Sequence, residues 1–590
     1  MAVLARGGNA FDAVVAGGFV LQVVEPHMCG PGGEVPAVFV TAGDPTPRVL
    51  CGQGVAPARA TTALLRDELG LAAIPGTGLL PATVPGAWDG WLTLLRDHGT
   101  FPLADVLGPA LAYAEDGFPL APPVPTTIAA VEQHLREHWP SSAATWLPDG
   151  RVPTTTHRLP ALAATWRRLL AEAVGPTREA QIDAARAAWY RGFVAEAIEE
   201  FVATPVRDAT GRDHAGLLTA DDLAGWSCSD EDAVVVEAGG GWAVAKPGPW
   251  SQGPVLAQTL QLLRDADLEY VDGLPSEAGV HRVAEAAKLA FADREAWYGD
   301  SHVADVPVKT LLSAGYADER RRLVGPEASA GLRPGAPDGR PPRLPDFVTR
   351  AFMGAGDDGS VSPVMDVEPP ARLLDPGTGE PTMRTSGPAG PAASSHRAGD
   401  TCHLDVADRF GNMVSATPSG GWLQSSPVIP GLGFCLGTRA QMFTLTPGLP
   451  ATLAPGQRPR TTLSPSLALR DREPYLAFGT PGGDQQDQWS LLFFLNHLTF
   501  GMNLQQAIDF PSFHSAHMPS SFYPRQAQPL ALDVESRIGE PVIEDLRRRG
   551  HLVNVRPAWS LGRISAVARR DGILYAAANP RGMQGYAVGR

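Results

Sequence analysis

One stretch decides the fold, AGDTCHLDV at residues 398–406. After Thr401 apolar and polar side chains alternate, with His403 and Asp405 on one face, as in a half-buried strand. Residues 408–417, DRFGNMVSAT, predict a turn and a returning strand. Thr401 is therefore predicted to be the first residue of a β-hairpin that follows an irregular segment.

A cut before Thr401 would give one residue both a hydroxyl nucleophile and a free α-amine able to act as its base. This is the hypothesis for the chemistry of the chain. The alternative from this stretch alone is that Thr401 is a β-branched residue beginning a strand, the commoner role of threonine. Cys402 is a second candidate nucleophile if the cut falls one residue later.

The composition is that of a globular protein and excludes several function classes. Of 590 residues, 44% are hydrophobic and 19% charged, and the formal net charge is −15 without a basic patch, so nucleic acid and anionic membrane are not expected partners. The five cysteines form no Cys-x-x-Cys pair, so we expect neither a metal nor a disulfide framework. There is no P-loop and no Gly-x-Ser-x-Gly elbow, and no cofactor is expected.

The printed chain shows no signal peptide and no apolar run of membrane-spanning length, which predicts a cytoplasmic location. A helical pattern begins almost at Met1, and Asn9 is predicted to cap a helix that ends near Pro26. The absence of a strand before this helix suggests a start site assigned too far downstream. An upstream signal sequence would change the compartment.

The chain divides at Thr401 into a helix-rich part, residues 1–400, and a sheet-rich part, residues 401–590. Residues 326–400 are rich in Pro, Gly, Ser and Asp without a sustained period, and predict a long exposed loop that ends at Asp400. In the second part, residues 466–478 and 564–577 each predict a hairpin.

Gly482 and Gly483 open a helix predicted over residues 484–497. Two glycines at a helix N-terminus present unobstructed backbone N–H groups where the helix dipole favours negative charge, as an oxyanion hole requires. A simple tight turn explains the same residues equally well.

Several motifs follow one another along the chain: GGNAFDA at 7–13, VEPH at 24–27, GPGG at 30–33, VPG at 84–86, AEDGF at 114–118, FADR at 291–294, GD at 299–300, DTCHL at 400–404, RTTLSP at 460–465 and PGG at 481–483. In this order they resemble the γ-glutamyltranspeptidases, a branch of the N-terminal nucleophile hydrolases, over almost the whole chain. The processing site differs slightly, because the family more often has Thr-Thr-His where this chain has Thr-Cys-His.

The resemblance implies an α+β fold, a four-layer αββα sandwich, built from a precursor that cuts itself between Asp400 and Thr401. The products would be a large subunit, 1–400, and a small subunit, 401–590, which together form one αββα domain, and the mature protein is a candidate homodimer. Thr401 would then attack a small-molecule amide, and water or an amine acceptor would release the acyl group.

The same resemblance assigns further site residues. Gly482 and Gly483 would form the oxyanion hole. Ser419 stands where the family has a second threonine that hydrogen-bonds the nucleophile. Thr461 and Thr462 stand where the family has a serine pair that holds the substrate.

Three positions depart from the family pattern. The arginine that grips the α-carboxylate of a γ-glutamyl group is replaced by Gln53, an asparagine by Gly421, and an acidic pair by residues near Gln441-Met442. A neutral amide does not replace a bidentate charged fork. The sequence thus predicts an autoprocessing amide hydrolase or acyltransferase that accepts γ-glutamyl or related amides. The alternatives are an acylase with another acyl specificity and a non-catalytic binding relative.

Overall fold

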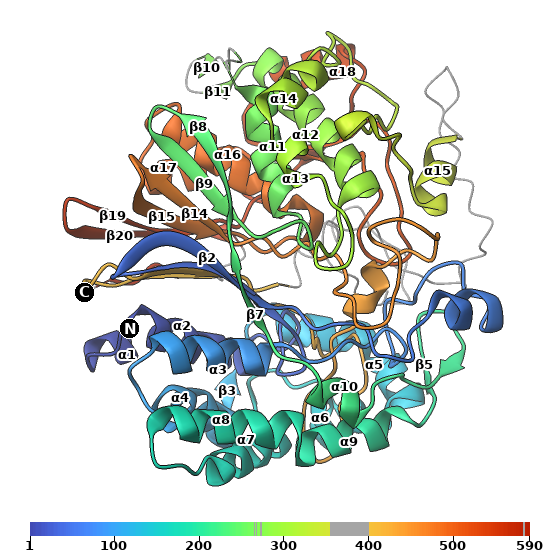
Figure 1. The fold of residues 1–590 in the computed structure, drawn as a ribbon, viewed down its shortest axis with the longest axis vertical. Coiled ribbons are helices and arrows are strands. Elements are labelled where there is room, and N and C mark those ends of the chain that lie inside the picture. The colour runs from blue at the N-terminus through green and yellow to red at the C-terminus, as the bar shows by residue number, and fades with distance from the viewer. Residues whose placement is uncertain are drawn as a thin grey trace.

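The computed structural model describes residues 1–264, 266, 268, 270–271, 274–353, 401–581 and 585–589. Two antiparallel sheets dominate and face each other (Figure 1). The first has the strand order β12-β13-β1-β2-β7, formed by β1 (Val35–Thr41), β2 (Asp44–Gly52), β7 (Ser229–Asp232), β12 (Leu404–Ala407) and β13 (Met413–Ala416). The second has the order β20-β19-β15-β14-β9-β8, formed by β8 (Val234–Gly239), β9 (Trp242–Lys246), β14 (Ser466–Arg470), β15 (Glu473–Gly479), β19 (Ser565–Arg570) and β20 (Ile573–Ala578).

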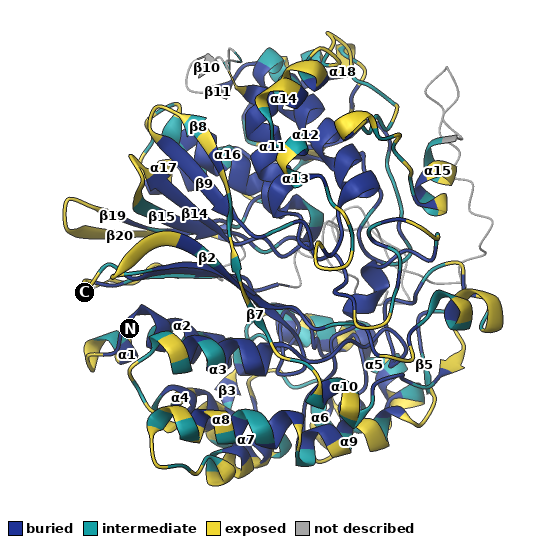
Figure 2. Ribbon diagram, viewed as in Figure 1, coloured by how far each residue is buried: buried dark blue, intermediate teal, exposed yellow. Residues whose placement is uncertain are grey.

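Helices cover the outer faces of the sheets. The first sheet contacts α2 (Ala10–Val24) and α3 (Ala87–His98), and the second contacts α11 (Gly253–Leu263) and α16 (Gln486–Leu498). Figure 2 shows that the middle of the two sheets and the helices beside them are largely buried, whereas exposed residues lie on the outermost helices and at the outer ends of β2 and the β19–β20 hairpin. Apolar side chains such as Val38, Met413 and Leu467 join the two sheets in a shared core.

The other elements extend these layers. Further helices are α1 (Ala2–Ala5), α4 (Leu103–Asp116), α5 (Pro123–His138), α6 (Pro140–Trp146), α7 (Pro160–Glu172), α8 (Arg178–Tyr190), α9 (Phe193–Val202), α10 (Ala220–Ala224), α12 (Glu277–Trp297), α13 (Val308–Leu311), α14 (Ala314–Arg321), α15 (Asp346–Met353), α17 (Leu504–Asp509) and α18 (Glu540–Arg548). Further strands are β3 (Phe118–Pro119), β4 (Thr156–His157), β5 (Val206–Arg207), β6 (Asp213–His214), β10 (Tyr270–Val271), β11 (Leu274–Pro275), β16 (Phe513–Ser515), β17 (Ala531–Glu535) and β18 (Leu552–Arg556).

The helix predicted after Asn9 is α2, and it is tied to the hairpin that follows Thr401. Asn9 and Asp12 form a capping box, in which each side chain accepts a hydrogen bond from the other residue's backbone amide. The carboxylate of Asp408 accepts from the backbone amide of Ala10 at 2.8 Å and from the amides of the turn residues 410–412. One carboxylate therefore fixes both the start of the helix and the turn of the β12–β13 hairpin.

Most of the predicted elements that position the site are confirmed, including the mixed helix and sheet class. The hairpins at 466–478 and 564–577 are β14–β15 and β19–β20. The prediction of a structureless loop over 326–400 is wrong in its first half, because α15 forms there and buries Val348. Residues 354–400, including Asp400 of the predicted cut, lie outside the described residues.

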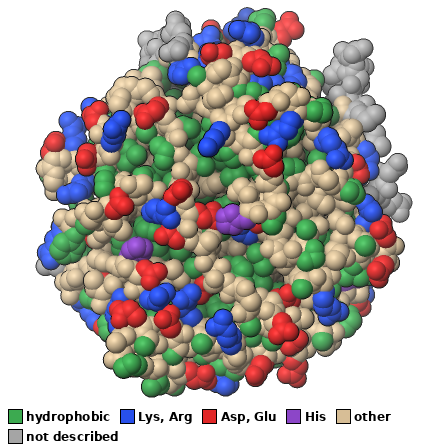
Figure 3. Space-filling view, viewed as in Figure 1, with side chains coloured by type: hydrophobic (Ala, Val, Ile, Leu, Met, Phe, Trp, Pro, Cys, Tyr) green, Lys and Arg blue, Asp and Glu red, His purple; other side chains and the backbone are tan. Residues whose placement is uncertain are grey.

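The surface in view carries acidic and basic side chains intermixed, with blue and red groups alternating over both halves of the molecule (Figure 3). Among the helices of the described residues, none is both long and apolar enough to cross a membrane.

Candidate active site

Thr401 is held at the start of the first sheet and its side chain is fully buried. It pairs with Ser419 in an isolated antiparallel bridge just before β12, and the amide of Cys402 donates to the carbonyl of Pro418 at 3.0 Å. The Oγ1 atom of Thr401 lies 3.2 Å from the Oγ atom of Ser419. The predicted contact between the nucleophile and Ser419 is therefore present in the structure.

The buried ion pair of Arg439 and Glu34 contacts Ser419. Arg439 donates from Nη2 to the Ser419 Oγ at 3.1 Å and from Nε to the Glu34 carboxylate at 2.7 Å. Because arginine only donates, Ser419 accepts this bond and can direct its own hydroxyl hydrogen to Thr401 Oγ1. Burial raises the pKa of Glu34, and the guanidinium of Arg439 opposes that rise.

The sequence analysis missed Glu34 and Arg439. Glu34 directly follows the GPGG motif, but its partner lies 405 residues further along the chain, and no local spacing connects the two. Glu34 also pairs through its backbone with Ser419, by amide-to-carbonyl bonds of 2.9 and 3.0 Å in the two directions. Strand pairing therefore places this carboxylate next to the site.

The two predicted oxyanion-hole glycines form a tight turn before α16. Gly482 has φ of 131° and Gly483 of 56°, a region that side chains other than glycine disfavour. A Cβ atom on Gly482 would lie 2.4 Å from the Trp489 ring. Within the described residues neither of the two glycine amide hydrogens has a backbone acceptor. Pro481, which precedes them, lines the same cavity as Thr401.

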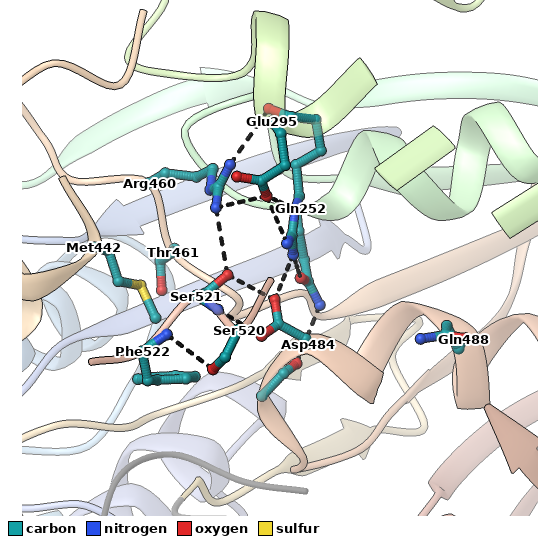
Figure 4. A network of polar contacts seen from close by, with 12 residues as sticks. Gln252, Glu295, Met442, Arg460, Thr461, Asp484, Gln488, Ser520, Ser521 and Phe522 are labelled. Carbon is teal, nitrogen blue, oxygen red and sulfur yellow. Dashed lines mark hydrogen bonds and ion pairs between the residues drawn. The ribbon is translucent and has the colours of Figure 1, made fainter. Parts of the chain in front are cut away.

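Figure 4 shows the polar network that fixes this glycine turn. Asp484 accepts from the backbone amide and the hydroxyl of Ser521, at 2.8 and 2.6 Å, and from Arg294. Gln252 donates to the carbonyl of Gly483 at 3.1 Å and accepts from Arg294 at 2.9 Å. The turn is therefore anchored by Gln252 at the start of α11, Arg294 in α12 and Ser521 in the segment after β16.

The carboxylates of this network stay ionised despite their burial. Burial favours the neutral form of Asp484, but Arg294 and the hydrogen bonds from Ser521 outweigh it and hold the pKa below its usual value. Glu295 behaves in the same way, because Arg460 and Arg294 lower its pKa against the effect of burial. Each of these two buried carboxylates is therefore paired with a buried arginine.

An apolar wall stands beside the ion pair, and its members are Trp422, Met442 and Phe522. The Arg439 guanidinium carbon lies 5.2 Å from the Trp422 ring centroid and 5.9 Å from that of Phe522. Met442 contributes a sulfur atom 3.8 Å from Arg439 Nη1. Met442, which lies near the predicted replacement of an acidic pair, is therefore part of a buried apolar cluster.

The predicted substrate-binding threonines lie on the strand-like segment before β14. The Thr461 amide donates to the Trp250 carbonyl at 2.8 Å, and its hydroxyl accepts from the Leu463 amide at 3.3 Å. Thr461 is drawn among the residues of the network in Figure 4, and Thr462 is equally buried. The structure therefore brings Thr461 into the neighbourhood of the apolar wall and the glycine turn.

The other two departures from the family pattern, Gln53 and Gly421, behave differently. The Gln53 side chain is fully buried and donates to the Gly54 carbonyl at 3.2 Å, but its Oε1 has no partner among the described residues. Gly421 has φ of 66°, and a Cβ there would lie 2.9 Å from the Gly33 amide nitrogen. No side chain fits at position 421, so this position can offer a substrate only its backbone.

A cavity of about 280 Å³ opens beside the nucleophile. Its lining includes Thr401, Cys402, Asp405, Pro481, Arg563 and Tyr586. It lies between the β12 strand and the β19–β20 hairpin and reaches the chain segment 585–588. A small molecule in this cavity would lie against Thr401 and Pro481.

Sequence reasoning placed His403 and Asp405 on one face but gave them no role. His403 lies 2.9 Å from the Thr417 hydroxyl through Nδ1 and 3.0 Å from the Asp405 carboxylate through Nε2. Asp405 also accepts from the Ser565 hydroxyl at 3.0 Å, which connects β12 to β19 across the two sheets. This chain of contacts fixes the strand that carries Thr401.

One group among the described residues has metal-ligand character. The ligand atoms of His281, Glu285 and His551 lie within 4.8 Å of one another. They are already used, because the two imidazoles meet at 2.9 Å and Glu285 pairs with Lys288 at 2.6 Å and Arg333 at 2.9 Å. Two cations beside the only carboxylate disfavour a bound metal ion. We assign this group to helix packing.

Comparison with known proteins gives a consistent result across the chain. The family described as gamma-glutamyltranspeptidase matches residues 1–355 and 367–589. The "Acylase ACY 1 proenzyme" of Pseudomonas sp. (strain SE83) is 29% identical, covering 98% of this chain and 88% of the relative. The "Oxamate amidohydrolase proenzyme" of Klebsiella pneumoniae is 30% identical, covering 98% and 94%. The solved structure of LmbA2991HD is 52% identical, with a TM-score of 0.88, covering 100% and 96%.

The chain belongs to the γ-glutamyltranspeptidase family. Of the relatives just named, one is called an acylase and another an oxamate amidohydrolase.

Proposed function

We propose that this chain is a precursor of an N-terminal threonine amide hydrolase, built as a four-layer αββα sandwich, whose acyl specificity is not γ-glutamyl. The observation that carries the proposal is the Thr401 hydroxyl, 3.2 Å from Ser419, in a residue that lines a cavity together with Pro481, the residue before the glycine turn. The family match and the names of the relatives support the same reaction class.

Maturation would proceed through an ester. The Thr401 hydroxyl attacks the carbonyl carbon of Asp400, the peptide C–N bond breaks as the ester forms, and water then hydrolyses the ester. The products are a new carboxylate at Asp400 and a free α-amine at Thr401. Two chains result, residues 1–400 and 401–590, and both sheets contain strands from each of them.

Catalysis would reuse the same atom. The α-amine of Thr401 accepts the hydroxyl proton as Oγ1 attacks the substrate carbonyl, and the leaving amine departs with that proton. The Gly482 and Gly483 amides stabilise the oxyanion, and Ser419 donates to Oγ1 while Arg439 holds it in place. Water, or an amine acceptor, then releases the acyl group. Cys402 is the weaker candidate nucleophile, because its buried thiol contacts Cys29 at 3.5 Å instead of Ser419.

The acyl specificity is inferred from the three positions that the resemblance assigns to the γ-glutamyl group. A γ-glutamyl group ends in an ammonium and a carboxylate, and each requires a counter-charge. Gln53 is neutral, Gly421 has no room for a side chain, and Met442 belongs to the apolar wall. Each missing charged hydrogen bond costs roughly 1.5–3 kcal/mol, about tenfold to a hundredfold in transition-state binding. Small or apolar acyl groups do not require these counter-charges.

An amide panel tests the proposal. Purified wild type is assayed with glutathione, γ-glutamyl-p-nitroanilide, oxamate and simple acyl anilides, each with and without glycylglycine. We expect kcat/KM for the best small or apolar acyl amide to exceed that for glutathione by about 100-fold or more. Efficient turnover of glutathione at a low KM would contradict the assignment of specificity.

Two matched variants test the chemistry. Thr401→Ala should abolish both the chain cut and turnover, whereas Thr401→Ser keeps a hydroxyl and should retain part of each. A wild-type chain that stays uncut and turns over no amide in the panel would favour the non-catalytic binding alternative.

A further inference from the structure

A pair of cysteines lies directly behind the nucleophile. The Sγ atoms of Cys29 and Cys402 are 3.5 Å apart, and both side chains are buried. Cys29 lies in the loop after α2, and Cys402 follows Thr401 in the chain. The pair packs with Met28 and Leu21 in a small apolar cluster. Neither cysteine is part of the proposed catalytic machinery.

The two cysteines are held by the same backbone segment. The Cys402 amide donates to the Pro418 carbonyl at 3.0 Å, and the amide of Gly30, next to Cys29, donates to the Gly420 carbonyl at 2.8 Å. Ser419, the partner of the nucleophile, lies between these two attachment points. A change in the spacing of the cysteines is therefore transmitted to the segment that aligns the Thr401 hydroxyl.

One member of the pair, Cys402, lines a cavity from which a small oxidant could reach it. Cys402 and Met28 line the 280 Å³ cavity beside Thr401. The hydrogen bond with Cys29, together with burial, raises the pKa of the Cys402 thiol well above its usual value. Since the thiolate is the reactive form, oxidation should be slow at neutral pH and faster in mild alkali.

We propose that Cys29 and Cys402 form a redox-active dithiol, which hydrogen peroxide converts to a disulfide that links the two cysteine segments and slows amide turnover. A disulfide requires an S–S distance of about 2.05 Å, so the sulfur atoms must approach by roughly 1.5 Å. Misplacement of a reacting group by about 1 Å costs on the order of 100-fold in rate. We therefore expect at least a tenfold loss of turnover.

The oxidation consumes one molecule of hydrogen peroxide and has two steps. The Cys402 sulfur attacks one oxygen of hydrogen peroxide, the O–O bond breaks, and a sulfenic acid and one water form. The Cys29 sulfur then attacks the sulfenic sulfur, the S–O bond breaks, and a second water leaves as the S–S bond forms. The two thiols lose two protons and two electrons in total, and peroxide is reduced to two waters.

One consequence rests on the proposed function. If the chain is cut before Thr401, Cys29 lies in the large subunit and Cys402 in the small one. The disulfide would then join the two subunits covalently, a state that thiol reductants reverse.

The test uses the purified full chain, treated with hydrogen peroxide at pH 8 and then alkylated under denaturing conditions. Peptide mapping by mass spectrometry should find a linked Cys29–Cys402 peptide that dithiothreitol removes. Non-reducing electrophoresis of a cut, oxidised chain should give one band that reductant resolves into two. Amide turnover should fall at least tenfold and return with dithiothreitol, which does not reduce methionine sulfoxide.

Two variants provide the controls. Cys29→Ala should keep the basal turnover and lose the response to peroxide, whereas Cys435→Ala, at another buried cysteine, should respond like wild type. Absence of the linked peptide, or a linked enzyme with unchanged turnover, would overturn the proposal. A chain that cleaves no amide refutes the proposed function instead, and the linked peptide still decides whether the dithiol is real.

Discussion

Replacement of Ser419 by alanine tests how the nucleophile is aligned. The Ser419 hydroxyl lies between two groups, 3.2 Å from Thr401 Oγ1 and 3.1 Å from Arg439 Nη2. In the ground state the variant loses one neutral hydrogen bond, worth about 1 kcal/mol. It also leaves a buried guanidinium N–H without this acceptor, which costs about 1–3 kcal/mol of folding stability.

The effect on catalysis should be larger than the effect on binding. Ser419 positions the Thr401 hydroxyl, and misplacement of a reacting group by about 1 Å costs on the order of 100-fold in rate, so removing Ser419 should lower kcat by roughly 100-fold. The substrate KM should change little, because Ser419 contacts the nucleophile. The chain cut should slow in parallel, since the Thr401 hydroxyl performs both the cut and the amide cleavage.

Steady-state kinetics on the best amide of the panel and a time course of chain cutting give the two readouts. Ser419→Thr, which restores the residue type of the family, is the matched control and should recover most of the rate. A Ser419→Ala variant with kcat within threefold of wild type would refute the reasoning. A variant in which KM rises while kcat stays unchanged would refute it as well.

Three further predictions concern the glycine turn, the Glu34–Arg439 ion pair and two buried histidines. Gly482→Ala should abolish turnover and destabilise the fold, because its Cβ would lie 2.4 Å from a tryptophan ring, whereas Gly108→Ala, with no atom within 4 Å, should be harmless in activity assays and thermal melts. Glu34→Gln should lower the free energy of unfolding by about 3 kcal/mol, because it leaves a buried arginine without its counter-charge, and an unchanged denaturant midpoint would argue against the ion pair. His27 and His551 have pKa values lowered by burial to about 3, so their neutral forms stabilise the fold fully above the unfolded pKa of about 6.5. This stability should be lost as the pH falls from about 6.5 toward 3, by up to about 1.4 kcal/mol per unit per histidine, and urea titrations at pH 7 and 5 should show the loss.

The parts of the fold that follow from local patterns could be predicted from the sequence. Alternation around Thr401 and the hairpins at 466–478 and 564–577 gave strands that the structure contains. The helix cap at Asn9 was equally readable, because a capping box is formed by residues three positions apart. Helix α15 was not predicted, because the residues around it are rich in Pro and Gly.

The site could be predicted only in part. Thr401 and the glycine turn lie within motifs, Ser419 was assigned through the resemblance, and the structure brings Ser419 to Thr401. The Glu34–Arg439 pair could not be foreseen, because it depends on strand pairing between distant segments. Gly421 was read as a lost substrate contact, and the structure adds the reason that no side chain fits there. The closeness of Cys29 and Cys402 likewise comes from the three-dimensional fold.

The central claim is that residue 401 becomes the N-terminal residue of its own chain and acts as the nucleophile. Intact-mass measurement and N-terminal sequencing of the purified active protein, before and after reduction, test this directly. The account predicts a small chain that begins Thr-Cys-His-Leu-Asp and becomes acylated at its first residue during slow turnover. A protein with an unbroken 400–401 bond and full amide turnover would contradict the account.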